Sequence, residues 1–253
     1  MRSSSVPVGI WQSIPSPVVS RYLARMGWDC VFIDGQHGAI SFETAYECIH
    51  ALRDAGARPY LRVSVGSPSE VQRALDIGAA GVVVPMVNTV REAELLACMA
   101  KYPPLGARSL GGDAPVHLGR DYPERANRET QLLVQIEHID SVEAAREILA
   151  VPGVDGCFVG PTDLALSMGL SRKAYEREPA HRRAMARIPA AARATGKLAW
   201  CNTYSLGDFR SKLAAGFTGL TLRSEADLLL ESGSSLLAQL RKETAPARRR
   251  KKS

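Results

Sequence analysis

The chain has 253 residues, of which 45% are hydrophobic and 23% are charged. This is an ordinary globular composition, with enough length for one large core. No stretch approaches the roughly 18 consecutive apolar residues of a membrane span. We therefore expect no membrane partner, and we expect no signal peptide because no apolar run follows Arg2.

The net charge of +6 is concentrated at the carboxyl terminus, where the run from Arg248 to Lys252 supplies five positive charges. The excess of basic over acidic residues therefore belongs to this terminal segment and says little about the fold. We expect residues 245–253 to form a disordered tail. A solvated tail is favoured over one that docks to nucleic acid or anionic lipid.

The cysteines indicate a reducing compartment. There are five of them, with no CxxC pair and no zinc-type spacing. An odd number in a chain of this length argues against a disulfide framework. The expected location is the cytoplasm.

Eight short apolar runs predict buried strands, and each is followed by a segment with helical spacing of apolar residues. The runs lack the alternation of a half-exposed strand, which indicates a sheet that is buried on both faces. In chain order the predicted strands are 8–11, 29–33, 59–63, 81–85, 132–137, 157–159, 198–202 and 219–223.

Eight strand–helix units in succession predict an α/β fold, a single (β/α)8 TIM barrel that occupies residues 1–244. No GxGxxG motif follows the first strand, which argues against a dinucleotide-binding fold. The interval 102–128 is long and rich in Gly, Pro and charged residues. A loop of this kind is expected to be a lid or an interface arm.

The carboxyl-terminal ends of barrel strands carry the chemistry of this fold. Polar side chains gather at these ends, so we expect them to share one mouth. They are Asp34, His37, Arg62, Gln135, Glu137, Asp163, Asn202 and Arg223.

Glu137 and Asp163 follow neighbouring strands and allow two interpretations. Two carboxylates that face one point suit Mg2+ or Mn2+, with water and substrate oxygens as the other ligands. Alternatively, Asp163 caps the helix that starts after Gly160 and Pro161, and Glu137 pairs with a surface cation. The backbone N–H groups of that helix start also attract anions.

Arg62 and His37 are open to interpretation as well. Arg62 would stabilise an oxyanion or form an ion pair with a barrel carboxylate. His37 would be an acid/base whose tautomer is fixed by Asp34, or a loop histidine bonded to backbone. No lysine ends a predicted strand, which disfavours a Schiff-base mechanism.

Five segments, in order along residues 8–225, resemble the HpcH/HpaI family of metal-dependent (class II) pyruvate aldolases. They are 33–38 (IDGQHG), 75–79 (LDIGA) with 84–86 (VPM), 102–109 (YPPLGARS), 134–137 (VQIE) and 159–164 (VGPTDL). The resemblance implies a lyase that cleaves a 4-hydroxy-2-oxo acid to pyruvate and an aldehyde. Related substrates include sugar acids and dicarboxylic acids.

The resemblance also implies a role for each matched position. The metal, which is Mg2+, Mn2+ or Co2+, would be held by Glu137 and Asp163 and would act as a Lewis acid. Arg62 would contact the keto oxygen of pyruvate, and His37 with Asp34 would act at the aldol hydroxyl. The substrate would be bound by Gln135, Gly160, Pro161, Thr162 and Asp163.

Two departures from the family pattern concern the mouth. Gln36 stands where many relatives have Glu. Arg223 lies where relatives commonly have a Gly-x-Asp turn. It adds positive charge near the mouth, which suggests an acidic acceptor or a different interface. The family is typically a hexamer that exchanges its C-terminal helices, so we expect a homo-oligomer in which residues 226–240 play that part. The competing hypothesis is a non-catalytic barrel with a tail that docks to nucleic acid.

Overall fold

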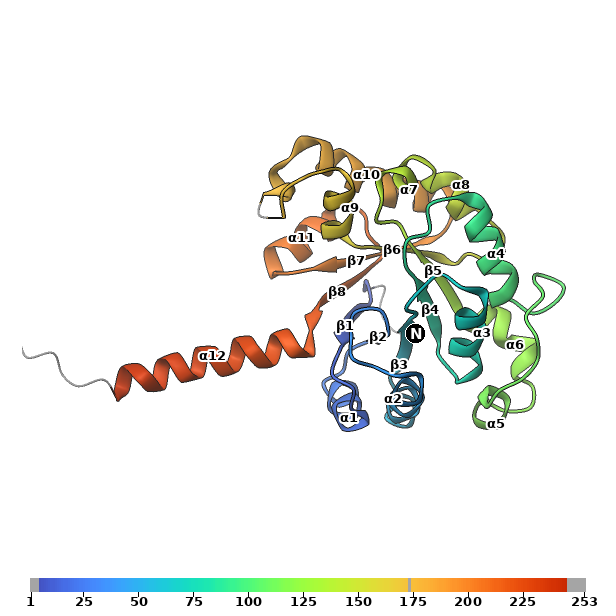
Figure 1. The fold of residues 1–253 in the computed structure, drawn as a ribbon, viewed down its shortest axis with the longest axis horizontal. Helices are drawn as coiled ribbons and strands as arrows, with labels where there is room; N and C mark the ends of the chain where they lie inside the picture. The colour runs from blue at the N-terminus through green and yellow to red at the C-terminus, as the bar shows by residue number, and fades with distance from the viewer. Residues whose placement is uncertain (1–4, 173, 245–253) are drawn as a thin grey trace, which may run out of the picture.

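The computed structural model describes residues 5–172 and 174–244, so the predicted basic tail at 245–253 lies outside the described residues. Eight parallel strands pair in chain order and close into a barrel (Figure 1), as predicted. The strands are β1 (Val8–Gln12), β2 (Cys30–Asp34), β3 (Arg58–Arg62), β4 (Gly81–Val84), β5 (Gln131–Gln135), β6 (Gly156–Val159), β7 (Leu198–Thr203) and β8 (Gly219–Ser224).

Helices surround the barrel, and serine or threonine caps several of them. Ser16 and Ser67 each cap a helix whose first residue is proline, because proline has no N–H to satisfy there. The helices are α1 (Pro17–Arg25), α2 (Phe42–Asp54), α3 (Pro68–Asp76), α4 (Val90–Ala100), α5 (Ala114–Leu118), α6 (Tyr122–Glu129), α7 (Ile139–Glu143), α8 (Ala145–Ala150), α9 (Pro161–Ser167), α10 (Pro179–Thr195), α11 (Leu206–Ala214) and α12 (Glu225–Glu243), with a 3-10 turn, η1, at Tyr175–Arg177.

Aromatic side chains fill the inside of the barrel. Phe32 lies at the centre, 4.8 Å from the ring of Tyr60 and 5.1 Å from that of Trp200. Glycines on neighbouring strands make room for these rings: a Cβ on Gly9 would approach Phe32 to 2.7 Å. A larger core, mostly of Val, Ile, Leu and Ala, lies between the strands and the helices.

The interval 102–128 is not a lid over the catalytic mouth. It contains α5 and α6, and buried side chains fix it near the amino-terminal ends of the strands. Arg108 pairs with Asp76 at the end of α3, and Lys101 bonds to Thr130 O and to Asp155, just ahead of β5 and β6. These contacts place the interval on the face opposite the carboxyl ends of the strands. Its role as an interface arm stays a prediction.

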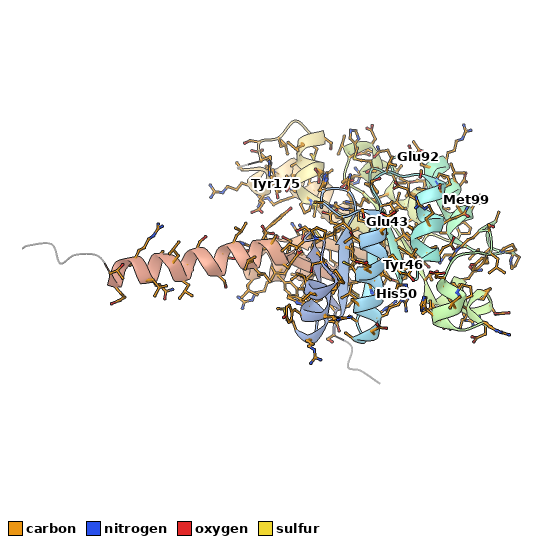
Figure 2. All side chains as sticks on the ribbon, turned by 60° about the horizontal axis from the view of Figure 1, so that its bottom comes forward. Glu43, Tyr46, His50, Glu92, Met99 and Tyr175 are labelled. Carbon is orange, nitrogen blue, oxygen red and sulfur yellow. The ribbon has the colours of Figure 1, made fainter. Side chains whose placement is uncertain are left out.

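The last helix, α12, leads away from the barrel in both views (Figure 1 and Figure 2). Its first residue, Glu225, still contacts the barrel, where it accepts from the backbone N–H groups of Ser13 and Ile14. Five leucines on it are between 48% and 68% exposed: Leu229, Leu230, Leu236, Leu237 and Leu240. In the described part of the chain, no helix has the length and apolar character needed to cross a membrane.

Candidate active site

A cavity of about 340 Å3 opens at the carboxyl-terminal ends of the strands, and its size suits a small organic molecule. It brings together most of the side chains that the sequence places at one mouth. Its lining includes Asp34, His37, Arg62, Gln135, Gly160, Asp163, Asn202 and Arg223.

Glu137 lies in the loop after β5 and is only 3% exposed. Its Oε1 accepts from the backbone N–H of Met86 at 2.9 Å, and its Oε2 accepts from Gln135 Nε2 at 2.6 Å. Met86 has φ 54, a left-handed conformation that is uncommon outside glycine, and in it the N–H donates to Glu137. The carboxylate is therefore held by the protein interior and does not pair with a surface cation.

Asp163 converges with Glu137 over Gly160. A Cβ built on Gly160 would lie 2.8 Å from Glu137 Oε2 and 3.0 Å from Asp163 Oδ2, so both oxygens border the space that glycine leaves open. Asp163 is the third residue of α9, whose N-cap is Gly160, and no side chain caps this helix. The helix-capping interpretation of Asp163 is therefore wrong.

These residues fit a divalent cation of the Mg2+ or Mn2+ type, which prefers carboxylate oxygens. Gln135 Oε1 is buried beside them without a hydrogen-bond partner, and it offers a further acceptor for a bound water or hydroxyl. In residues 5–172 and 174–244, no three His, Cys, Asp or Glu side chains form a metal-binding group. The other ligands of a cation would therefore be water and substrate.

The electrostatics of the pair agree with this fit. Burial raises the pKa of Glu137 to about 7; the charge of Asp163 adds to the effect, while the Met86 N–H and Arg62 oppose it. A buried carboxylate beside another one is costly when both are ionised. A cation bound between them would offset that cost.

Arg62 forms a two-point ion pair with Asp34. Its Nε donates to Oδ1 at 3.0 Å and its Nη2 to Oδ2 at 2.7 Å, and the guanidinium carbon lies 4.5 Å from the centre of the Trp11 ring. The register of β2 and β3 sets Asp34 opposite Arg62, which explains the pairing. Burial alone would raise the pKa of Asp34, but the bonds and charge of Arg62, with two backbone N–H groups, hold it below its usual value.

His37 is not oriented by Asp34 in the expected way. Asp34 Oδ1 accepts from the backbone N–H groups of His37 and Gln36, both at 3.0 Å, so the carboxylate fixes the loop and not the imidazole. The His37 side chain is exposed and lines the cavity. The role of this histidine as an acid/base stays a prediction.

Pro161 and Thr162 lie behind the cavity and do not line it. The Pro161 carbonyl accepts from His181 Nε2 at 3.0 Å, and the Thr162 hydroxyl lies 3.1 Å from that of Tyr204. The substrate-binding role of these two residues stays a prediction. Their backbone and that of Gly160 still form the start of α9.

Several lining residues are absent from the sequence prediction: Trp11, Ser13, Phe158, Tyr204, Ser224 and Asp227. Trp11 ends the predicted strand 8–11 but is aromatic, and the sequence prediction considered only polar residues at the strand ends. Tyr204 directly follows β7, so a longer predicted strand would have included it. The Trp11 indole donates to Thr221 Oγ1 at 3.1 Å, which in turn donates to Asn202 at 2.9 Å. This network fixes the floor of the cavity.

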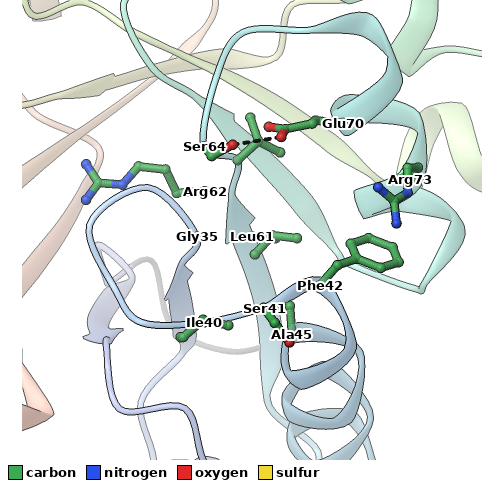
Figure 3. A pocket seen from close by; sticks show the side chains of 11 residues that line it. Gly35, Ile40, Ser41, Phe42, Ala45, Leu61, Arg62, Ser64, Glu70 and Arg73 are labelled. Atoms are coloured by element: carbon green, nitrogen blue, oxygen red, sulfur yellow. Dashed lines mark hydrogen bonds between the residues drawn. The ribbon is translucent and has the colours of Figure 1, made fainter.

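A second, smaller cavity lies between β3 and the helices α2 and α3 (Figure 3). The Arg62 guanidinium points away from it, and its carboxylate, Glu70, already accepts from the Ser64 hydroxyl at 2.7 Å and from Val65 N–H at 3.1 Å. Since this carboxylate is already bonded within the protein, the cavity at the mouth is the better candidate for the active site.

Comparison with known proteins finds relatives over most of the chain. Residues 8–219 match the family model "HpcH/HpaI aldolase/citrate lyase". A hydroxypyruvate/pyruvate aldolase of Rhizorhabdus wittichii is 36% identical over 91% of this chain and 92% of its own length. A 2-keto-3-deoxy-L-rhamnonate aldolase of Shigella sonnei is 34% identical over 79% of this chain and 77% of its own.

A solved structure gives the same result for the fold. The HpcH/HpaI aldolase of Desulfitobacterium hafniense superposes with a TM-score of 0.88 at 25% identity, covering 97% of this chain and 95% of its own. The aldolase relatives also argue against a barrel without catalysis. The chain belongs to the HpcH/HpaI aldolase/citrate lyase family and is a carbon–carbon lyase of the aldolase type.

Proposed function

We propose that this protein reversibly cleaves a 4-hydroxy-2-oxo acid to pyruvate, or a related 2-oxo acid, and an aldehyde. The observation that carries the proposal is the convergence of Glu137 and Asp163 over Gly160, in a mouth shared with Arg62. A divalent cation held by the two carboxylates would supply Lewis-acid chemistry at the 2-oxo group.

The reaction needs no oxidant or reductant. The C3–C4 bond of the substrate breaks, its electron pair stays on C3 as the enolate of pyruvate, and the proton of the C4 hydroxyl leaves as the aldehyde forms. A proton then adds to C3. The protein therefore has to stabilise negative charge on the keto oxygen and to accept a proton near C4.

Arg62 suits the first task. Asp34 binds its Nε and Nη2, so the guanidinium is fixed in place and Nη1 remains for the keto oxygen. The backbone N–H groups at the start of α9 would bind the substrate carboxylate, since no side chain caps them. Gln135 Oε1 would accept from a hydroxyl or a water in the cavity.

His37 suits the second task. It lines the cavity from an exposed position in the loop that Asp34 fixes, and with bound water it would act as acid/base at the aldol hydroxyl. The names of the relatives support two substrate classes, a hydroxypyruvate or pyruvate aldol and a deoxy sugar acid. Both fit the same bond cleavage.

Pyruvate release from a 4-hydroxy-2-oxo acid tests the proposal. Activity should disappear with EDTA and return with Mg2+, Mn2+ or Co2+. Turnover that survives complete chelation would contradict the metal assignment. A covalent adduct trapped by borohydride would replace it with a Schiff-base mechanism.

We also propose that the working enzyme is a cytoplasmic homo-oligomer, a hexamer as in the family, in which α12 packs on a second copy. The exposed leucines of α12 offer apolar surface for such a contact, together with exposed Val18 and Tyr22 on α1 and Met26 directly after it. All five cysteines are free thiols, which agrees with a reducing compartment. Light scattering should give a hexamer mass, and Leu229→Ser with Leu236→Ser should lower it; a monomeric wild-type protein would contradict this arrangement.

A further inference from the structure

Arg223, at the end of β8, has an unusual backbone conformation. Its φ is 55, and among the non-glycine residues that the structure describes only Met86 shares a positive φ. This left-handed region is disfavoured for any residue with a Cβ. Met86 donates its N–H to a catalytic carboxylate from this conformation, so the second such residue at the same mouth calls for a functional explanation.

The conformation holds the Arg223 side chain at the catalytic cavity, which it lines together with Arg62 and His37. Its Nε donates to the Tyr204 carbonyl at 2.8 Å, and its Nη1 donates to Glu231 at 2.9 Å. No hydrogen bond joins Nη2 to another residue of the described chain. Two donors therefore fix the guanidinium plane and one nitrogen remains for a ligand.

The charge of Arg223 is only weakly compensated. Its partner Glu231 has a side chain that is 63% exposed, and ion pairs with such solvated groups contribute little. Arg62 differs, because Asp34 binds it at two points in a nearly buried pair. The nearby Asp227 uses Oδ2 to accept from the backbone and hydroxyl of Ser224, so it is engaged as a helix cap.

We propose that Arg223 binds a carboxylate on the aldehyde half of the substrate, so that the preferred acceptor is an aldehyde that carries a carboxylate. The inference rests on the proposed aldolase function and adds the acceptor class to it. Arginine presents N–H donors in a plane that matches a carboxylate, and such charge-assisted bonds are strong. Arg223 transfers no proton in this role; it determines specificity.

The test compares acidic aldehydes with neutral ones of equal length in aldol addition to pyruvate. Glyoxylate is matched with acetaldehyde, and succinic semialdehyde with butanal. The readout is the ratio of kcat/KM for the acidic and the neutral member of a pair. We expect Arg223→Gly to lower this ratio about 10- to 100-fold for at least one pair, as loss of a charge-assisted bond implies. Arg223→Lys should recover part of the ratio.

Two controls separate recognition from folding. Glycine adopts φ 55 without strain, so the melting temperature of Arg223→Gly should not fall. Arg146→Ala removes an exposed arginine of α8 that forms no ion pair with residues 5–172 or 174–244, and it should leave the ratio unchanged. A ratio that is the same in wild type and Arg223→Gly would overturn the inference.

Failure of the proposed function gives a different result. Exchange of the pyruvate methyl protons with deuterated water reports enolisation without any aldehyde. If the wild-type protein catalyses neither exchange nor addition to any aldehyde, the aldolase proposal fails. If proton exchange and addition to neutral aldehydes proceed, but the acidic-to-neutral ratio of kcat/KM is the same in the wild type and Arg223→Gly, only the assignment of Arg223 fails.

Discussion

Gly160 offers the sharpest test of the proposed cation site. Its φ of −94 and ψ of 94 are extended values that alanine adopts as well, so Gly160→Ala adds a methyl group without straining the backbone. The new Cβ would lie 2.8 Å from Glu137 Oε2 and 3.0 Å from Asp163 Oδ2, where ordinary contacts begin at 3.4 Å. The two oxygens must therefore retreat by roughly 0.4 to 0.6 Å, about the limit that a preorganised site tolerates.

We expect this displacement to weaken Mn2+ binding about 10- to 100-fold, the range typical of disturbed metal-ligand positions, which is about 1.4 to 2.7 kcal/mol. Isothermal titration with Mn2+ measures the Kd, and excess Mn2+ should restore part of the aldolase rate. Gly207→Ala is the matched control. It adds the same methyl in the first turn of α11, where the nearest atom, Ser205 Oγ, is 3.8 Å away.

The control should bind Mn2+ as the wild type does. The reasoning would be refuted if folded Gly160→Ala bound Mn2+ with the wild-type Kd, because the cation would then not lie where the two carboxylates converge. A fall in melting temperature of both variants alike would indicate a packing effect unrelated to the site.

Three further changes test the mouth and the tail. Asp34→Asn should lower kcat/KM about 10- to 100-fold by releasing Arg62. Because the fold holds the pKa of Asp34 below its unfolded value near 4, the ionised carboxylate stabilises the wild type above that pH, and this contribution is lost on acidification. The free energy of unfolding in urea should therefore fall more between about pH 5 and 2 for the wild type than for the variant. His37→Ala should reduce aldol cleavage about 100-fold while methyl-proton exchange of pyruvate changes far less; equal losses would assign His37 to enolate chemistry. Deletion of residues 248–253 should leave turnover unchanged, and a large loss would give the tail a function.

Much of the fold was predictable because its signals are local. Unalternating apolar runs such as that of β4 occur where a sheet is buried on both faces, and eight of them with intervening helical patterns leave few folds other than a barrel. The gathering of Arg62, Gln135 and Asp163 followed from the same pattern, since parallel strands present their carboxyl ends to one face.

The contacts among these residues were less predictable because they depend on register and backbone angles. Asp34 lies three residues from His37 in sequence, which suggested a pair, but the β2–β3 register sets its carboxylate opposite Arg62. The ion pair of Arg62 with a barrel carboxylate is thus confirmed, and its role toward an oxyanion stays a prediction. No local pattern indicates that Met86 has a positive φ and donates to Glu137.

The pairing of charges at the mouth bears on how it binds an acidic substrate. Asp34 neutralises Arg62, whereas Glu137 has no cationic partner at hydrogen-bond distance among the described residues and lies close to Asp163. The raised pKa of Glu137, due first to burial and also to Asp163, shows that negative charge is unfavourable there. A 2-oxo carboxylate that approached these two acids alone would be repelled. A divalent cation held by the two carboxylates would reverse the sign of the field that the substrate meets, so the proposed function predicts that the cation binds before the substrate.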